Sequence, residues 1–232
     1  MNHATPGERW PAVLLRLAAA SSVCVALVLL RVLWTGEPDY MFLVWNLALA
    51  WAPFVLAIAV YGSYRHGASA AWLVAPGVAW LLFLPNAPYM VTDFVHLPNG
   101  EGVPIWFDAL ALAAYAGTGL LLGFASLYLM QAVAARAVGD RIVWWCVVAV
   151  LSLSSVGIYL GRFQRLNSWD AVRHPRLIAA MIRERLQAPL DNPTLITVTL
   201  FFTVFLSVAY LLAYTLVAAR REREEHPGAA RR

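Results

Sequence analysis

Charge is scarce in this sequence. Only 13% of its 232 residues are charged, whereas about a quarter are charged in soluble domains. Lysine is absent, so all 17 basic side chains are Arg, and the formal net charge is +4. A positive balance in a soluble protein would suggest nucleic acid. Here most arginines flank apolar segments, as in membrane proteins, and we therefore expect no nucleic-acid partner.

Cysteine and the common catalytic motifs are also scarce. Cys24 and Cys146 lie in separate apolar segments, and no C-x-x-C or Cys/His spacing exists. This excludes zinc and redox sites of the usual kind. Walker, G-x-S-x-G and H-E-x-x-H motifs are missing as well. We expect no cofactor and no metal, and the sequence leaves open whether the protein is an enzyme.

Apolar residues dominate instead, at 61% of the chain, and they come in long blocks that only a bilayer solvates. A membrane helix needs about 20 such residues to cross about 30 Å. The sequence predicts an all-α, polytopic integral membrane helix bundle of about six transmembrane helices, forming a single membrane domain over residues 1–232. The predicted spans are 11–34, 40–61, 68–84, 109–130, 142–161 and 194–219.

The arginines predict an orientation. They gather in the N-terminal tail, near residues 65 and 136–141, and in residues 220–232, whereas the loops around 37–39 and 91–104 have none. This pattern predicts a bacterial inner (plasma) membrane protein with both termini, including a basic tail at 220–232, in the cytoplasm. The loop at 162–193 disagrees, because it carries six arginines on the opposite side. Either the span count is off by one, or this loop has a reason to be basic.

The same loop predicts a short amphipathic interfacial helix near residues 175–187. Pro175 suits a first helical position, and apolar residues then recur at helical spacing while charged residues occupy the rest of the wheel. Those apolar residues are Ile178, Met181, Ile182 and Leu186. The alternative is an ordinary loop helix that covers the bundle.

A first polar segment follows the third predicted span. Two prolines, Pro85 and Pro88, should break a helix there. Four polar residues spaced 3, 4 and 3 apart would then share about 80° of a helix surface. They are Asn86, Tyr89, Asp93 and His96. Broken helices at membrane depth line cavities or protein-buried sites. The alternative is a hydrated extracytoplasmic loop, where a charge costs little.

A second polar segment covers residues 157–170. Tyr159, Arg162 and Arg165 share one helix face, and the guanidinium groups suit phosphate or carboxylate. The candidate ligand-binding residues of the two segments are Asn86, Tyr89, Tyr159, Arg162, Arg165, Asn167, Trp169 and Asp170. Asn167, Ser168 and Asp170 also resemble capping residues of a short helix. The alternative is that Arg162 and Arg165 simply end the fifth span.

Both segments fall on the same predicted side of the membrane, so their charged groups could meet in one pocket. The catalytic candidates are Asp93, His96 and Asp108, and Arg162, Arg165 and Asp170 would complete the pocket. A carboxylate, an imidazole and a guanidinium can recognise an anionic head group or transfer protons on it. The same residues could equally form a structural ion-pair network.

Small and polar residues inside the spans predict helix packing. Two G-x-x-x-G patterns, Gly119–Gly123 and Gly157–Gly161, permit close approach of helices in lipid. Asn46, in the second predicted span, is expected to hold helices together rather than to bind a ligand.

Four stretches carry a family resemblance: LVWNLALAWAPF (43–54), WLLFLPNAPYMVTDFVHL (80–97), IWFDALALAAYAGTGLLLGFASLY (105–128) and GIYLGRFQRLNSWD (157–170). Together they resemble the bacterial family called domain of unknown function 1361, over about residues 30–215. The resemblance implies a multi-pass membrane protein. It implies no activity and no catalytic residue.

Three functions fit these patterns. The first is binding or processing of a lipid or lipid-linked anionic group by an extracytoplasmic Asp/His/Arg cluster. The second is a non-catalytic structural or assembly subunit, and the third is a small transporter or channel. The expected partners are the lipid bilayer and an anionic lipid or lipid-linked ligand, and no pattern indicates the oligomeric state.

Overall fold

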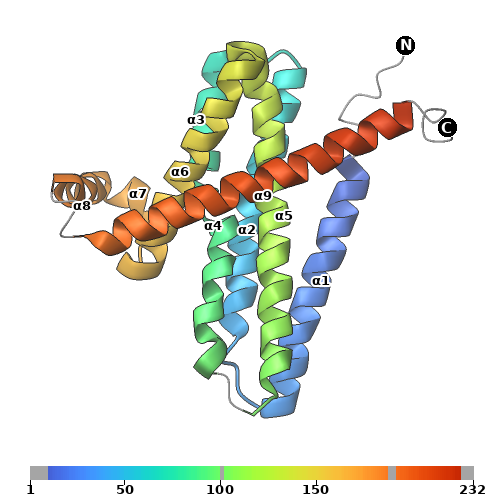
Figure 1. The fold of residues 1–232 in the computed structure, drawn as a ribbon, viewed down its shortest axis with the longest axis vertical. Helices are drawn as coiled ribbons and strands as arrows, with labels where there is room; N and C mark the ends of the chain where they lie inside the picture. The colour runs from blue at the N-terminus through green and yellow to red at the C-terminus, as the bar shows by residue number, and fades with distance from the viewer. Residues whose placement is uncertain (1–9, 100–101, 188–191, 226–232) are drawn as a thin grey trace. The chain divides into compact units, whose positions relative to one another are not determined.

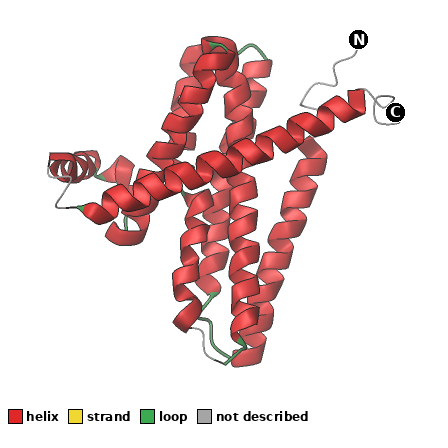
Figure 2. Ribbon diagram, in the orientation of Figure 1, coloured by secondary structure: helices red, strands yellow, loops and turns green. Residues whose placement is uncertain are grey.

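The computed structural model describes residues 10–99, 102–187 and 192–225, which are helices joined by short loops (Figure 2). The described elements are α1 (Trp10–Thr35), α2 (Met41–Arg65), α3 (Ala70–Phe83), α4 (Asn86–Tyr89), the 3-10 helix η2 (Met90–Asn99), α5 (Ile105–Val138), α6 (Asp140–Gln164), α7 (Asp170–Arg173), α8 (Pro175–Gln187) and α9 (Pro193–Glu225) (Figure 1).

Six helical segments of the described chain are long and apolar enough to cross a membrane. They are Trp10–Thr35, Met41–Arg65, Ala70–Leu97, Ile105–Val138, Asp140–Gln164 and Pro193–Arg220. A 25-residue helix is roughly 38 Å long, more than the hydrocarbon core requires. The predicted all-α membrane bundle with about six spans is confirmed. The short helix predicted near residues 175–187 is present as α8, and its place at the membrane interface stays a prediction.

The third span is longer than the sequence indicates. The sequence predicts an end at Leu84, before Pro85, and α3 does end at Phe83, but helical structure resumes at Asn86 and the candidate span reaches Leu97. Pro85 has φ −57° and ψ −25°, which are helical values. The proline therefore interrupts the hydrogen-bond ladder without turning the chain away, because its ring fits the first turn of a new helix.

Side chains satisfy backbone carbonyls around this break. The Asn86 side-chain amide donates to the Phe83 carbonyl at 2.9 Å, and the Thr92 hydroxyl donates to the Tyr89 carbonyl at 2.6 Å. Backbone groups in lipid must find partners within the protein, since water is absent. These two contacts make an interrupted helix compatible with a membrane-spanning segment.

The chain forms two compact units, 1–126 and 127–232, and α5 contributes to both. In unit 1, α2 packs against α1, α3 and α4. In unit 2, α6 packs against α9, and α8 packs against α7. The single membrane domain over 1–232 stays a prediction.

Helices of unit 1 are joined by side-chain hydrogen bonds inside the spans. The Trp51 indole donates to the Ser21 hydroxyl at 3.0 Å, and the Trp80 indole donates to the Ser126 hydroxyl at 3.2 Å. Polar contacts of this kind hold helices together in lipid, where the hydrophobic effect contributes little to helix association.

The Gly119–Gly123 pattern marks a close contact in unit 1. A β-carbon on Gly119 would clash with the Ala87 carbonyl oxygen and lie 2.9 Å from the Met90 sulfur. One on Gly123 would lie 3.1 Å from the Ala87 side chain. The interrupted segment at α4 therefore packs directly onto the glycine surface of α5, as small residues allow.

Candidate functional site

A buried ion pair joins α1 to α5. The Arg31 guanidinium donates from Nε to Asp108 Oδ1 at 2.8 Å and from Nη2 to Oδ2 at 3.4 Å. Both side chains are 1% exposed. Arg31 lies one turn before the end of α1, and Asp108 lies in the first turn of α5. Two-point contact of this geometry is the strong form of an Arg–carboxylate interaction.

Tyr40 covers this pair from the start of α2. Its ring centroid lies 4.0 Å from the Arg31 guanidinium carbon, a cation–π contact. Its hydroxyl donates to the His96 carbonyl oxygen at 3.3 Å. Burial, and next the negative charge of Asp108, raise the pKa of Tyr40 to about 12. The phenol therefore stays protonated and remains a donor at physiological pH.

Asp93 lies in η2, the element whose His96 carbonyl accepts from Tyr40. It is 1% exposed, and the Asn46 side-chain amide donates to its Oδ2 at 3.0 Å. Because a 3-10 helix has three residues per turn, Asp93 and His96 share one face of η2. The His96 ring centroid lies 4.8 Å from that of Phe42. Asn46 holds α2 against η2, in agreement with its interpretation as a packing residue.

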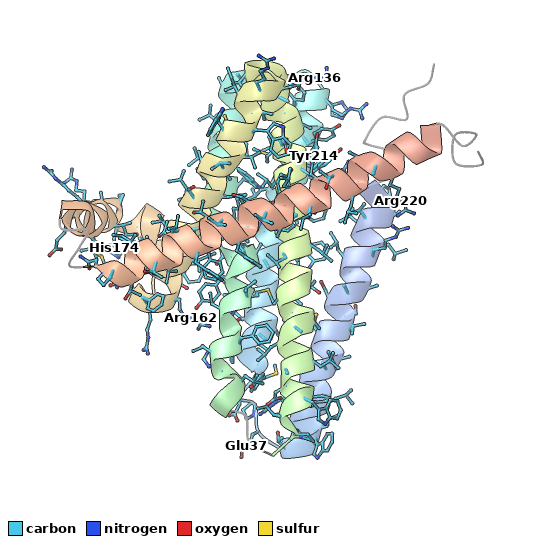
Figure 3. All side chains as sticks on the ribbon, in the orientation of Figure 1. Glu37, Arg136, Arg162, His174, Tyr214 and Arg220 are labelled. Carbon is cyan, nitrogen blue, oxygen red and sulfur yellow. The ribbon has the colours of Figure 1, made fainter. Side chains whose placement is uncertain are left out.

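These residues form what we call the unit 1 polar cluster: Arg31, Asp39, Tyr40, Asn46, Asp93, His96 and Asp108. Asp39 marks its solvent edge, because it is 58% exposed and its Oδ2 lies 4.0 Å from Arg31 Nη1. Arg31, Asp39 and Tyr40 lie in or next to the connection between α1 and α2, which also carries Glu37, labelled in Figure 3. Arg31 and Asp93 are each four residues from the end of a candidate span, so these charges lie near span ends.

The charges of the cluster are mainly negative. Three carboxylates, of Asp39, Asp93 and Asp108, stand against one guanidinium and one imidazole, and Asp108 neutralises Arg31. A carboxylate repels an anion and accepts hydrogen bonds from hydroxyl or ammonium groups. The cluster thus suits such donors better than it suits a phosphate.

Of the predicted catalytic candidates, Asp93 contacts Asn46, His96 contacts Tyr40 through its backbone carbonyl, and Asp108 contacts Arg31. That the three side chains share one pocket, and their chemical roles, stay predictions. The other two residues of the first polar segment lie in α4. Asn86 donates its amide to the backbone, and Tyr89 is half-buried, with a carbonyl that accepts from Thr92. Their observed contacts support the break in the helix.

The second polar segment belongs to unit 2. Tyr159 is buried in α6 and stacks on Phe163 with ring centroids 5.2 Å apart, and Arg162 is half-buried in the last turn. Arg165 ends α6 in the left-handed conformation, with φ 55°. The Leu166 amide donates to the Leu160 carbonyl at 3.2 Å, which closes the helix end.

The loop after α6 holds the remaining candidates. The Asp170 carboxylate accepts the Asn167 backbone N–H at 2.7 Å and its side-chain amide at 3.5 Å. Trp169 precedes the first residue of α7 and is half-buried. Asp170 thus makes a local contact, but it is the first residue of α7, and the N-cap residue is Trp169, which makes no side-chain capping hydrogen bond. The prediction that this segment shares a pocket with Asp93 and His96 stays a prediction.

Sequence reasoning missed Arg31 and Tyr40. The signal was present, because an arginine four residues inside the end of an apolar span must face a partner or a polar surface. Its partner, Asp108, is 77 positions away, and no local pattern connects them. Among the described residues, no group of three His, Cys, Asp or Glu side chains could hold a metal ion.

Comparison with known proteins identifies the family. The model of the family described as "Protein of unknown function (DUF1361)" matches residues 45–208, more than half of the chain. The chain belongs to this family. The matched range includes Asn46, Asp93, His96 and Asp108 but begins after Arg31 and Tyr40. Neither the curated proteins nor the solved structures contain a match.

Proposed function

We propose that this membrane protein binds the head group of a lipid or lipid-linked molecule at the unit 1 polar cluster. The observation that carries the proposal is Asp93, a carboxylate 1% exposed within a candidate span, held by the Asn46 amide just after a helix break. Ionisable groups in membrane segments are costly and usually serve a site. Interrupted helices line such sites in membrane proteins.

Each part of the cluster has a task in this proposal. Asp93 and His96 would contact the ligand, since a carboxylate and an imidazole can accept its hydrogen bonds or exchange protons with it. Arg31 and Asp108 would position the surrounding helix ends. The excess of carboxylates favours a head group that presents hydroxyl or amino groups to this cluster. An anionic part of the ligand would need arginines that lie elsewhere in the chain.

A structural function is the second candidate, and one observation favours it. Arg31, Asp108 and Tyr40 contact one another closely and connect α1, α2 and η2 to α5 without any ligand. Such a network could serve only to hold the bundle together. The two candidates differ in what Asp93 does, because only the first requires Asp93 to touch a bound molecule.

The test is an analysis of the lipids that purify with the full-length protein. Asp93→Asn keeps the shape of the side chain and removes its charge. Asp140→Asn makes the same change at an exposed site in the first turn of α6 and serves as the control. We expect a lipid species that is enriched with the wild type to fall several-fold in Asp93→Asn and to persist in Asp140→Asn. Identical lipids in all three proteins would contradict lipid binding at Asp93 and favour the structural function.

A further inference from the structure

The most basic stretch of the chain lies between α6 and α9. Residues 162–187 contain six arginines and two carboxylates, a surplus of four positive charges, equal to the net charge of the whole chain. The helices on either side, α6 and α9, are both candidate spans. A short segment between two spans is confined to the surface of the membrane. Its arginines therefore lie close to the lipid head groups at that surface.

Four of these arginines are exposed: Arg165, Arg173, Arg176 and Arg183. We call them the basic surface. None of the four forms an ion pair with a described residue. The nearby Asp170 carboxylate accepts the Asn167 backbone N–H instead. The guanidinium groups are therefore available to an external anion, and each can donate two parallel hydrogen bonds to a phosphate.

The geometry of α8 directs two of these arginines to one side. Arg176 and Arg183 are seven residues apart, so they lie within about 20° of each other on the helix and about 10 Å apart along it. Leu177, which is 56% exposed, lies on the same exposed half of the helix. Ala179 and Ala180 on the same half are exposed as well, whereas Ile178 and Met181 on the other half are partly buried, so the described residues leave this half uncovered. Arginines beside an exposed leucine suit a surface that is anionic and apolar.

We propose that the basic surface binds the phosphate groups of anionic phospholipids in the leaflet that it faces. The proposal gives a physical reason for the arginine-rich loop that disagrees with the rest of the chain's arginine distribution. Each arginine near an anionic membrane surface strengthens membrane binding roughly five-fold, which is about 1 kcal/mol per residue. The proposal does not depend on the function proposed for the unit 1 polar cluster.

The experiment measures which lipid contacts α8. Cys24 and Cys146 are replaced by Ala, and a fluorophore is attached to a single cysteine introduced by Leu177→Cys in the full-length protein. The protein is reconstituted in phosphatidylcholine vesicles that contain either brominated phosphatidylglycerol or brominated phosphatidylcholine as quencher. We expect phosphatidylglycerol to quench several-fold more effectively. Arg176→Gln with Arg183→Gln should bring the preference close to one.

Two controls make the result specific. Arg136→Gln with Arg141→Gln removes two exposed arginines outside this segment and should leave the preference unchanged. High salt should remove the preference in the wild type, because the screening length falls to about 3 Å at 1 M. This salt measurement decides the matter if the double variant at α8 fails to fold. Equal quenching by both lipids, no quenching by either, or a preference that survives both the double substitution and high salt would overturn the proposal.

Discussion

Arg31 Nε lies 2.8 Å from Asp108 Oδ1 in a setting where both side chains are 1% exposed. The two residues are 77 positions apart, in α1 and α5, so the pair ties the ends of two candidate spans together. Either charge alone would be costly to bury, whereas the pair with its Tyr40 cover is mutually compensated. The loss of either partner should therefore destabilise the protein more than the loss of both.

Removing one member of this pair should destabilise the protein strongly. We expect Arg31→Met or Asp108→Leu alone to cost about 3–5 kcal/mol, because each leaves an uncompensated buried charge. The double variant should recover most of the loss, since an apolar pair of similar size can replace a buried ion pair. The melting temperature is measured in detergent, from the loss of monodisperse protein on heating, for the wild type, the two single variants and the double variant. A double variant no more stable than the single variants would contradict this account.

The glycines of α5 provide a second prediction with a control on the same helix. Gly119→Ala should cost about 1–3 kcal/mol, because its methyl group would clash with the Ala87 carbonyl oxygen. Gly117→Ala meets nothing within 4 Å and should gain up to about 1 kcal/mol from better helix propensity. The same unfolding measurement compares them. If both substitutions shift the melting temperature in the same direction, α4 does not pack closely on α5 at Gly119.

Tyr40 predicts a loss of stability at alkaline pH. Burial and the charge of Asp108 raise its folded-state pKa from 10 to about 12, so the folded protein holds the phenol proton more tightly than the unfolded chain does. The contribution of Tyr40 is therefore complete below pH 10 and is lost as the pH rises through about 12. We expect the melting temperature of the wild type to fall more steeply over this window than that of Tyr40→Phe. Parallel curves for the two proteins would exclude this linkage.

Much of the fold could be predicted because lipid imposes a simple requirement on each span. Long apolar runs such as that of α1 must be helical, and the periodicity after Pro175 was sufficient to predict α8. The sequence places the end of the third span before Pro85, because a proline ends a helix in isolation, whereas the candidate span continues to Leu97. Here the side chains of Asn86 and Thr92 donate to backbone carbonyls around the break. Such compensation depends on three-dimensional contacts that a local pattern does not contain.

The candidate site could be predicted in part, for a related reason. Asp93 and His96 stand out because polar residues follow a proline break, and Asp108 stands out as a carboxylate at the start of an apolar run. Arg31 and Tyr40 belong to other helices and meet these residues only in the folded chain. Their presence changes the chemistry, since Asp108 neutralises Arg31 and leaves a cluster rich in carboxylates. The charge of a site depends on pairing between residues that are distant in the sequence, and the spacing of residues within one segment does not predict such pairs.

Arg165 offers a way to separate charge from stability. It is the only described residue other than glycine with a positive φ, and the left-handed conformation costs a side-chain-bearing residue roughly 1–2 kcal/mol. Arg165→Gly removes both the strain and the guanidinium, so we expect thermal stability to be unchanged or up to about 1 kcal/mol higher. Arg162→Gly, within the last turn of α6, should instead lose about 1 kcal/mol.

If the basic surface binds anionic lipid, Arg165→Gly should also weaken the preference of that surface for phosphatidylglycerol while the fold stays intact. A variant that is less stable than the wild type would show that the Arg165 side chain has a structural partner in the membrane, and that this helix end is not strained.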